Sequence, residues 1–305
     1  MEDPDLFILS TIEDPSSRRI TSLPSWVPDL SASPEVASLC YPQPHISIPY
    51  NAGDGAERQV DWSPGKPNEL RIRGCKAGKI ISITEVEEKT DLVAIVAKAQ
   101  KLTASQPPKY PTGESTTDAL WRTLVGNCTG APQYQYPAPS SYSKSFEAFQ
   151  SANKLLPEKL TVEVPTRKPS FSRRIFNAAK RLTREKKRDD TRRDSVQPVM
   201  SKSEMSNLAS LFCDAAKSVV QRRRFFVTND GFYGLAPIST EIGDFVSVFA
   251  GGKVPFIIRE LAGFSEDGAD GSTAFKFIGE CYCHGYNEGQ VAPADGFRWE
   301  ELHLR

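Results

Sequence analysis

The fold is decided by residues 222–286, which read RRRFFVTNDGFYGLAPISTEIGDFVSVFAGGKVPFIIREL…FKFIGECYCHGY. This stretch has the densest alternation of β-branched and aromatic residues in the chain, a composition typical of strands. Turn-forming triplets interrupt it: Asn-Asp-Gly at 229–231, Ile-Gly-Asp at 242–244 and Gly-Gly-Lys at 251–253. Short apolar runs between such turns predict successive antiparallel strands joined as hairpins.

The segment after Gly251-Gly252 shows the alternation most clearly. Val254, Phe256 and Ile258 fall on one face of a strand and Ile257 on the other, because side chains alternate along extended chain. We expect this strand to pair with residues 245–249 across the glycine turn, and we expect Phe256 to be buried. Pro255 has no N–H to donate, so it must lie at a bulge or face away from the partner strand.

A second β segment lies upstream at residues 69–84. Leu70 and Ile72 alternate with arginines, Cys75 to Gly78 provides a turn, and Ile81 and Ile83 resume an apolar face, which predicts a hairpin. The expected fold class is therefore α+β. It comprises a small antiparallel sheet or partly closed β-barrel built from the hairpin 69–84 and the strands of 222–286.

Helices are expected within the insertion 90–220. Asp91 and Asp118 each precede apolar residues at helical spacing, so each is predicted to cap a helix. Ser201 and Glu204 have the spacing of a capping box at the start of a helix that leads directly into the strand at Arg222. These helices are available to cover the edges and faces of the sheet.

The first 68 residues contain many prolines and one tryptophan. Pro24 and Pro28 fix the backbone on both sides of Trp26, so residues 23–29 are predicted to form an extended, rigid segment. Trp26 needs an apolar surface to lie against. Residues 31–68 hold further prolines and no long apolar run, which predicts loop or extended chain.

Three stretches resemble fungal heterokaryon incompatibility (HET) proteins. Residues 231–260 (GFYGLAPISTEIGDFVSVFAGGKVPFIIRE) and 275–290 (FKFIGECYCHGYNEGQ) are similar to the C-terminal region of that family. Arg18-Arg19 with residues 23–29 (LPSWVPD) resembles the segment that closes its HET domain, and residues 120–124 (LWRTL) resemble a landmark between the two.

The resemblance implies a role in fungal self/non-self recognition and incompatibility cell death, with the HET domain as effector. It implies that residues 1–68 are a connector following a HET domain whose body is missing here, and that 69–300 form the α+β domain. We therefore expect a non-catalytic recognition or regulatory module, truncated relative to its family. Its expected partner is a protein, with another incompatibility protein as the first candidate.

One cluster of cysteine and histidine residues could form a metal site or a catalytic pair. Cys281, Cys283 and His284 are close enough in sequence for a zinc site or a Cys/His nucleophile pair. If 275–284 is one strand, however, Phe277 and both cysteines face one side and His284 the other. We therefore expect no metal, no cofactor and no enzymatic activity.

The opposite face of that strand supplies a candidate interaction surface. It combines an acid, an aromatic ring, an imidazole and an amide: Glu280, Tyr282, His284 and Asn287. The competing interpretation is that Tyr282 packs and the other three are solvated, as on the polar face of an ordinary antiparallel sheet.

Residues 166–194 are a basic insertion. Arg167 to Arg193 contains twelve lysines and arginines against three acidic residues. We expect this segment to be disordered, because it has little apolar surface to bury. The alternative is that it binds a nucleic acid, an anionic membrane surface or an acidic partner. The candidate anion-binding residues are Arg173, Arg174, Lys180 and Arg181.

Composition limits the remaining possibilities. The formal net charge is zero, which argues against a polyanion-binding role for the whole chain. The six cysteines have no paired spacing, which suits a reducing compartment. No signal peptide or transmembrane segment is recognisable, so a cytoplasmic location is expected.

We expect trypsin to cut residues 166–194 well before the hairpins, because a mobile segment rich in lysine and arginine exposes cleavage sites. Mass spectrometry of a digestion time course measures the order of cleavage. Equal resistance along the whole chain would show instead that the insertion is docked.

Overall fold

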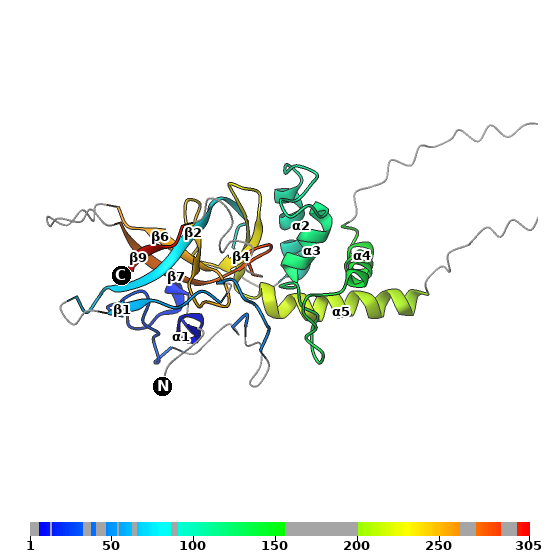
Figure 1. Ribbon diagram of the computed structural model, residues 1–305. Helices are drawn as coiled ribbons and strands as arrows, with labels where there is room; N and C mark the ends of the chain where they lie inside the picture. Colours follow the sequence, from blue (N-terminus) through cyan, green and yellow to red (C-terminus); the bar gives the residue numbers. More distant parts are fainter. Residues whose placement is uncertain are drawn as a thin grey trace, which may run out of the picture.

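The computed structural model describes residues 6–12, 14–32, 38–40, 47–53, 55–62, 66–86, 91–155, 201–262, 273–287 and 298–305. Strands gather on one side of the molecule and the helices α2 to α5 on the other (Figure 1). The class is α+β, as expected from the sequence.

The described residues form a sheet of nine strands. They are β1 (Val60–Trp62), β2 (Leu70–Ile83), β3 (Arg223–Thr228), β4 (Tyr233–Pro237), β5 (Phe245–Phe249), β6 (Phe256–Glu260), β7 (Ala274–Glu280), β8 (Tyr282–Cys283) and β9 (Glu300–Leu304). Their order is β5-β6-β7-β9-β2-β3-β4-β8, with β1 beside β2. An additional pairing between β2 and β5 closes β5, β6, β7, β9 and β2 into a ring of hydrogen-bonded strands.

Strand β2 corrects the predicted hairpin 69–84. It is one continuous strand of fourteen residues, and Cys75 to Gly78 is not a turn. Its first part pairs with β9, its middle with β5 and its end with β3. The register shifts between Lys76 and Gly78 and again between Ile80 and Ser82, so bulges bend the strand from one partner to the next. A bulge and a turn leave similar glycine-containing signatures in the sequence.

The sheet is mixed instead of wholly antiparallel. Strand β9 lies parallel to β7, with Ala274 opposite His303 and Phe275 opposite Leu304. The other strand pairs are antiparallel, including the predicted pairing of β5 with β6. Strands β1 and β9 were not predicted, although Leu302 and Leu304 show the alternation expected of a short strand.

A bulge in β7 corrects the predicted faces of residues 275–284. The pairing with β6 skips Ile278, and Gly279 has φ of +148°. A Cβ at Gly279 would lie 2.9 Å from Pro237 Cγ, so the position favours glycine. One extra residue exchanges the faces of all that follow, which is why Phe277 joins one core cluster and Cys281 the other.

The helices are α1 (Phe7–Ser10), α2 (Leu92–Thr103), α3 (Thr116–Leu124), α4 (Ser143–Ala152) and α5 (Lys202–Val220), with 3₁₀ turns at Pro15–Ser17 and Ser140–Tyr142. The predicted cap Asp91 and the capping box of Ser201 and Glu204 are confirmed. Helix α3 is capped by Ser115 instead of Asp118, which lies within the first turn and accepts hydrogen bonds from Ser115 and Trp121.

The N-terminal segment packs on the sheet. Residues 23–29 form turns, with Val27 N donating to Pro24 O, and not the predicted extended segment. Trp26 lies partly buried against the main core cluster, so it has an apolar surface within this chain. Ser25 lies beside β7, and its hydroxyl accepts a hydrogen bond of 2.8 Å from Phe277 N.

The aromatic core confirms the predicted burial of Phe256. Its ring stacks on Phe249 at 4.9 Å between centroids and lies 5.6 Å from Phe277. Val254 and Ile258 share its core cluster, whereas Ile257 belongs to the second cluster on the other face. Both faces of β6 are therefore covered.

We expect Phe256→Ala to lower the free energy of unfolding by roughly 3–5 kcal/mol, because it empties an aromatic core site. Chemical denaturation measures the change. Ile242→Ala is the control, since Ile242 is 65% exposed and its truncation should change stability by no more than about 0.5 kcal/mol. Equal midpoints for the two variants would contradict the aromatic core described here.

Candidate functional site

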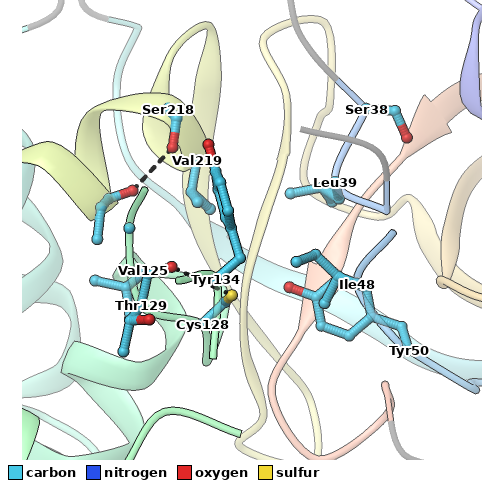
Figure 2. A pocket seen from close by; sticks show the side chains of 12 residues that line it. Ser38, Leu39, Ile48, Tyr50, Val125, Cys128, Thr129, Tyr134, Ser218 and Val219 are labelled. Atoms are coloured by element: carbon cyan, nitrogen blue, oxygen red, sulfur yellow. Dashed lines mark hydrogen bonds between the residues drawn. The ribbon is translucent and has the colours of Figure 1, made fainter. Parts of the chain in front are cut away.

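A small pocket lies at the seam between the sheet and the helices. Figure 2 shows Leu39, Ile48 and Tyr50 on one side and Val125 and residues of α5 on the other. We call it the seam pocket; its volume is about 30 Å³. The lining residues are Ser38, Leu39, Ile48, Tyr50, Val125, Cys128, Thr129, Gly130, Tyr134, Ala215, Ser218 and Val219. A space of this size holds a water molecule or the end of a side chain.

The polar groups of the seam pocket are uncharged. Tyr50 donates a hydrogen bond of 2.6 Å to Gly126 O, and burial raises its pKa well above the usual value. Burial also raises the pKa of Cys128 to about 12, so this thiol stays protonated at neutral pH. The Ser218 hydroxyl donates to Ala215 O within α5. The pocket thus offers apolar contacts and neutral hydrogen-bonding groups.

A buried ion pair lies behind the pocket. Arg223, the first residue of β3, and Glu280, the last of β7, meet with 2.9 Å between Nη2 and Oε1. Their side chains are 4% and 8% exposed. Removing one member of such a pair leaves an uncompensated charge in a medium of low dielectric constant.

The ion pair holds both walls of the seam pocket. Glu280 Oε1 accepts a hydrogen bond of 2.7 Å from Leu39 N, and Oε2 accepts one of 3.2 Å from Ser38 Oγ. Arg223 Nη1 donates to Val219 O at 3.0 Å. Leu39 and Val219 face each other across the pocket (Figure 2), so the pair fixes the N-terminal segment and the end of α5 together.

The contacts of Glu280 identify its ionisation state. Burial raises its pKa, and burial likewise lowers the pKa of Arg223. The groups that contact the Glu280 carboxylate are nevertheless donors: a guanidinium, a backbone N–H and a serine hydroxyl. A carboxylate that accepts hydrogen bonds from each neighbour is stabilised in its charged form. The two residues therefore form a charged pair at neutral pH.

A second network runs from the pocket to the surface. The Tyr50 ring lies 5.9 Å from that of Tyr282, whose hydroxyl is 2.8 Å from His284 Nδ1. His284 Nε2 is 2.7 Å from Glu114 Oε1. A neutral imidazole with its proton on Nε2 satisfies both contacts. Burial raises the pKa of Glu114, but hydrogen bonds from His284 and Thr112 and the nearby charge of Arg122 outweigh this, and the pKa is lowered overall.

This row of hydroxyl, imidazole and carboxylate groups links separate segments of the chain. Tyr282 is 1% exposed, so this end of the row is buried. The backbone of His284 is held from both sides, since its N–H donates to Tyr233 O and its carbonyl accepts from Tyr110. The row joins the loop that carries Glu114 to the end of the sheet.

The four residues predicted as an exposed interaction surface are instead buried. Glu280, Tyr282, His284 and Asn287 are each 6% exposed or less. Asn287 Oδ1 accepts a hydrogen bond from Cys283 N. The competing interpretation, with only Tyr282 packed, is also corrected, because the N-terminal segment and the loop of Glu114 cover this end of the sheet.

The predicted cysteines lie in the second core cluster. Burial raises the pKa of Cys281 and of Cys283 well above the usual value, so both thiols are protonated at neutral pH. Within the described ranges, His, Cys, Asp and Glu form no group of three or more that could hold a metal ion.

Other predicted features lie elsewhere. The basic insertion 166–194 falls outside the described residues, and with it the candidate anion-binding residues Arg173, Arg174, Lys180 and Arg181.

Among the helices that the structure describes, none has the length and apolar character needed to cross a bilayer.

Sequence reasoning missed Arg223, Leu39 and Glu114. Arg223 stands in a run of three arginines, and nothing local separates the buried one from its neighbours. Leu39 contributes a backbone N–H, which has no signature in the sequence. Glu114 lies in a turn 170 residues from His284.

Known proteins match the chain in two comparisons. Residues 76–302 match the sequence profile of a family described as the Het-6 beta-barrel domain. Over 85 residues the chain is 30% identical to a Neurospora crassa protein named heterokaryon incompatibility protein 6, OR allele. That alignment covers 28% of this chain and 11% of the relative, so the matched part is a small fraction of the relative's length. No solved structure matches the chain.

We expect Glu280→Gln to lower the free energy of unfolding by roughly 3–5 kcal/mol, because it leaves the Arg223 charge buried without its partner. The double variant with Arg223→Met should lose less than the sum of the two single changes, since no charge is then left uncompensated. Urea denaturation of the four proteins completes the cycle.

The control is Glu85→Gln. Glu85 is 87% exposed and 3.2 Å from Lys98, and an exposed pair contributes no more than about 1 kcal/mol. A loss no larger for Glu280→Gln than for Glu85→Gln would contradict the role given to the buried pair.

Proposed function

From the premise that this chain belongs to the heterokaryon incompatibility family with a Het-6 beta-barrel domain, we propose that it is a non-catalytic recognition module. Its role is to contact a protein partner in fungal self/non-self recognition, and a separate effector carries out the cell death response. The cytoplasm, where other incompatibility proteins would be met, is the proposed location.

The family membership supports a role in heterokaryon incompatibility. The profile match confirms the resemblance seen in the sequence and extends over residues 76–302. The name of the Neurospora relative ties that protein to heterokaryon incompatibility. The alignment covers only 11% of that relative. The assignment of recognition to this chain and of cell death to a separate effector is therefore our proposal.

The proposal of a non-catalytic role rests on one observation: the carboxylate of Glu280 and the imidazole of His284 are both occupied by contacts within the protein. General acid, base or nucleophilic catalysis needs such a group within reach of a substrate. Here Glu280 is bound to Arg223 and Leu39 N, and His284 lies between Tyr282 and Glu114. Each spans segments distant in sequence, and neither lines the seam pocket.

The seam pocket suits recognition better than chemistry. Its walls come from two parts of the fold, and its lining is apolar with neutral hydroxyls. An apolar or hydroxyl-bearing side chain of a partner fits such a lining, because it replaces water without leaving a charge unpaired. Contact there would act directly on the packing between α5 and the N-terminal segment.

The test is growth of a fungal host. We expect normal growth when the chain is expressed alone, since it has no effector activity of its own. Arrest is expected when a second incompatibility protein that carries a HET domain is expressed with it. Colony growth rate after induction measures both. Arrest by this chain alone would overturn the proposal.

A matched pair of variants tests the seam pocket. Ser218→Phe places a bulky ring at its α5 wall and should prevent arrest in the co-expression strain. Leu211→Phe adds a ring to the same helix at a residue that is 50% exposed and does not line the pocket. It should leave arrest unchanged. Arrest that survives Ser218→Phe would contradict recognition at this pocket.

A further inference from the structure

A second, larger cleft lies on the sheet side, away from the seam pocket. Its volume is about 420 Å³, and it lies between the N-terminal segment around Leu23 on one side and strand β7, Asn68 and Leu261 on the other. Ligand pockets for small molecules typically measure about 300–1,000 Å³. We call it the β7 cleft.

The lining of the β7 cleft is basic. It includes Arg18, Lys276 and Arg305, and among the described residues that line it there is no aspartate or glutamate. Arg305 Nη2 already contacts Glu69 Oε2 at 2.9 Å, so much of its charge is balanced. Arg18 donates to the carbonyl oxygens of Leu23, Pro24, Ser25 and Val27.

Lys276 is the decisive cation. It lies in β7 between the buried Phe275 and Phe277, and its side chain is half-buried on the opposite face. Its cross-strand neighbour Arg259 is paired with Asp244 and Glu241. Among the described residues, no ion pair joins Lys276 to a carboxylate, in contrast to Arg259. An unpaired ammonium at the wall of a cleft attracts an anion.

The cleft is also preformed. Ser25 Oγ accepts from Phe277 N and donates to Arg305 O, which clamps the N-terminal segment to β7 and to the end of β9. The carbonyl contacts of Arg18 fix the turn of residues 23–27 that forms the opposite wall. A preformed site loses less conformational entropy on binding.

The rest of the lining defines the ligand class. Leu23, Pro24 and Leu261 are apolar, and Ser22 and Thr21 add hydroxyls at an exposed edge. We propose that the β7 cleft binds a small amphipathic anion, with a phosphate or carboxylate headgroup at Lys276 and an apolar body against Leu23 and Leu261. This inference is independent of the recognition role proposed above.

The first experiment uses 8-anilinonaphthalene-1-sulfonate, an amphipathic anion whose fluorescence rises in apolar sites. The full chain should bind it at one saturable site. Lys276→Met keeps the apolar stem and removes the charge, so it should weaken binding by about tenfold or more, the effect of losing a charged hydrogen bond.

Matched controls separate charge at the cleft from charge elsewhere. Lys101→Met makes the same change at an exposed residue of α2 and should leave binding unchanged. Ser22→Asp adds an acid at the cleft edge and should weaken binding without altering the core. Circular dichroism confirms the fold of each variant. Equal binding by the parent chain, Lys276→Met and Ser22→Asp would overturn the proposal.

A matched pair of competitors tests whether the cleft requires a negatively charged headgroup. Decyl phosphate, below its micelle concentration, should displace the dye, whereas decyltrimethylammonium has a tail of the same length and the opposite charge and should not. Equal displacement by the two would overturn the proposal. Co-sedimentation with phosphatidylglycerol vesicles distinguishes the source: Lys276-dependent sedimentation assigns a lipid headgroup, and displacement by decyl phosphate without sedimentation assigns a free amphiphile.

Discussion

The structure depends on the buried pair of Arg223 and Glu280. Two charges in the interior are costly unless each is matched, and here the carboxylate is matched by a guanidinium, by Leu39 N and by Ser38. The guanidinium in turn donates to the end of α5. One ion pair therefore fixes the relative positions of the N-terminal segment, two strands and the longest helix. An apolar replacement would remove this directional linkage between the segments.

Strand β2 has a comparable role within the sheet. Its fourteen residues pair in turn with β9, β5 and β3, so a single strand belongs both to the closed ring and to the strands that extend from it. Gly74 lies where the partners of β2 change from β9 to β5. A Cβ there would approach Leu302 Cδ1 to 2.7 Å and Phe249 Cδ1 to 2.8 Å, so side chains of both partner strands occupy the space over this glycine. The bulges between Lys76 and Gly78 and between Ile80 and Ser82 provide the bend.

The two concave regions differ in chemistry. The seam pocket is small, neutral and bounded by two parts of the fold, whereas the β7 cleft is larger and basic and has a clamped wall. A neutral seam favours contact with another protein, because its occupant need not compensate a charge. A basic cleft favours an anionic molecule. The two sites lie on different parts of the N-terminal segment, at Leu39 and at Leu23.

The sequence by itself determined the local elements: the β5 and β6 hairpin across Gly251, the burial of Phe256, the caps at Asp91 and Ser201, and the α+β class. Each follows from periodicity or capping within a few residues, as did the resemblance carried by contiguous motifs. Only the tertiary structure decided that β2 runs unbroken, that β9 lies parallel to β7, and that Glu280 and His284 are buried. The physical reason is that their environment comes from distant segments: Glu280 meets a backbone N–H 241 residues away, and His284 meets Glu114 across 170 residues. A polar residue on an alternating strand has the same local pattern whether water or another segment covers it.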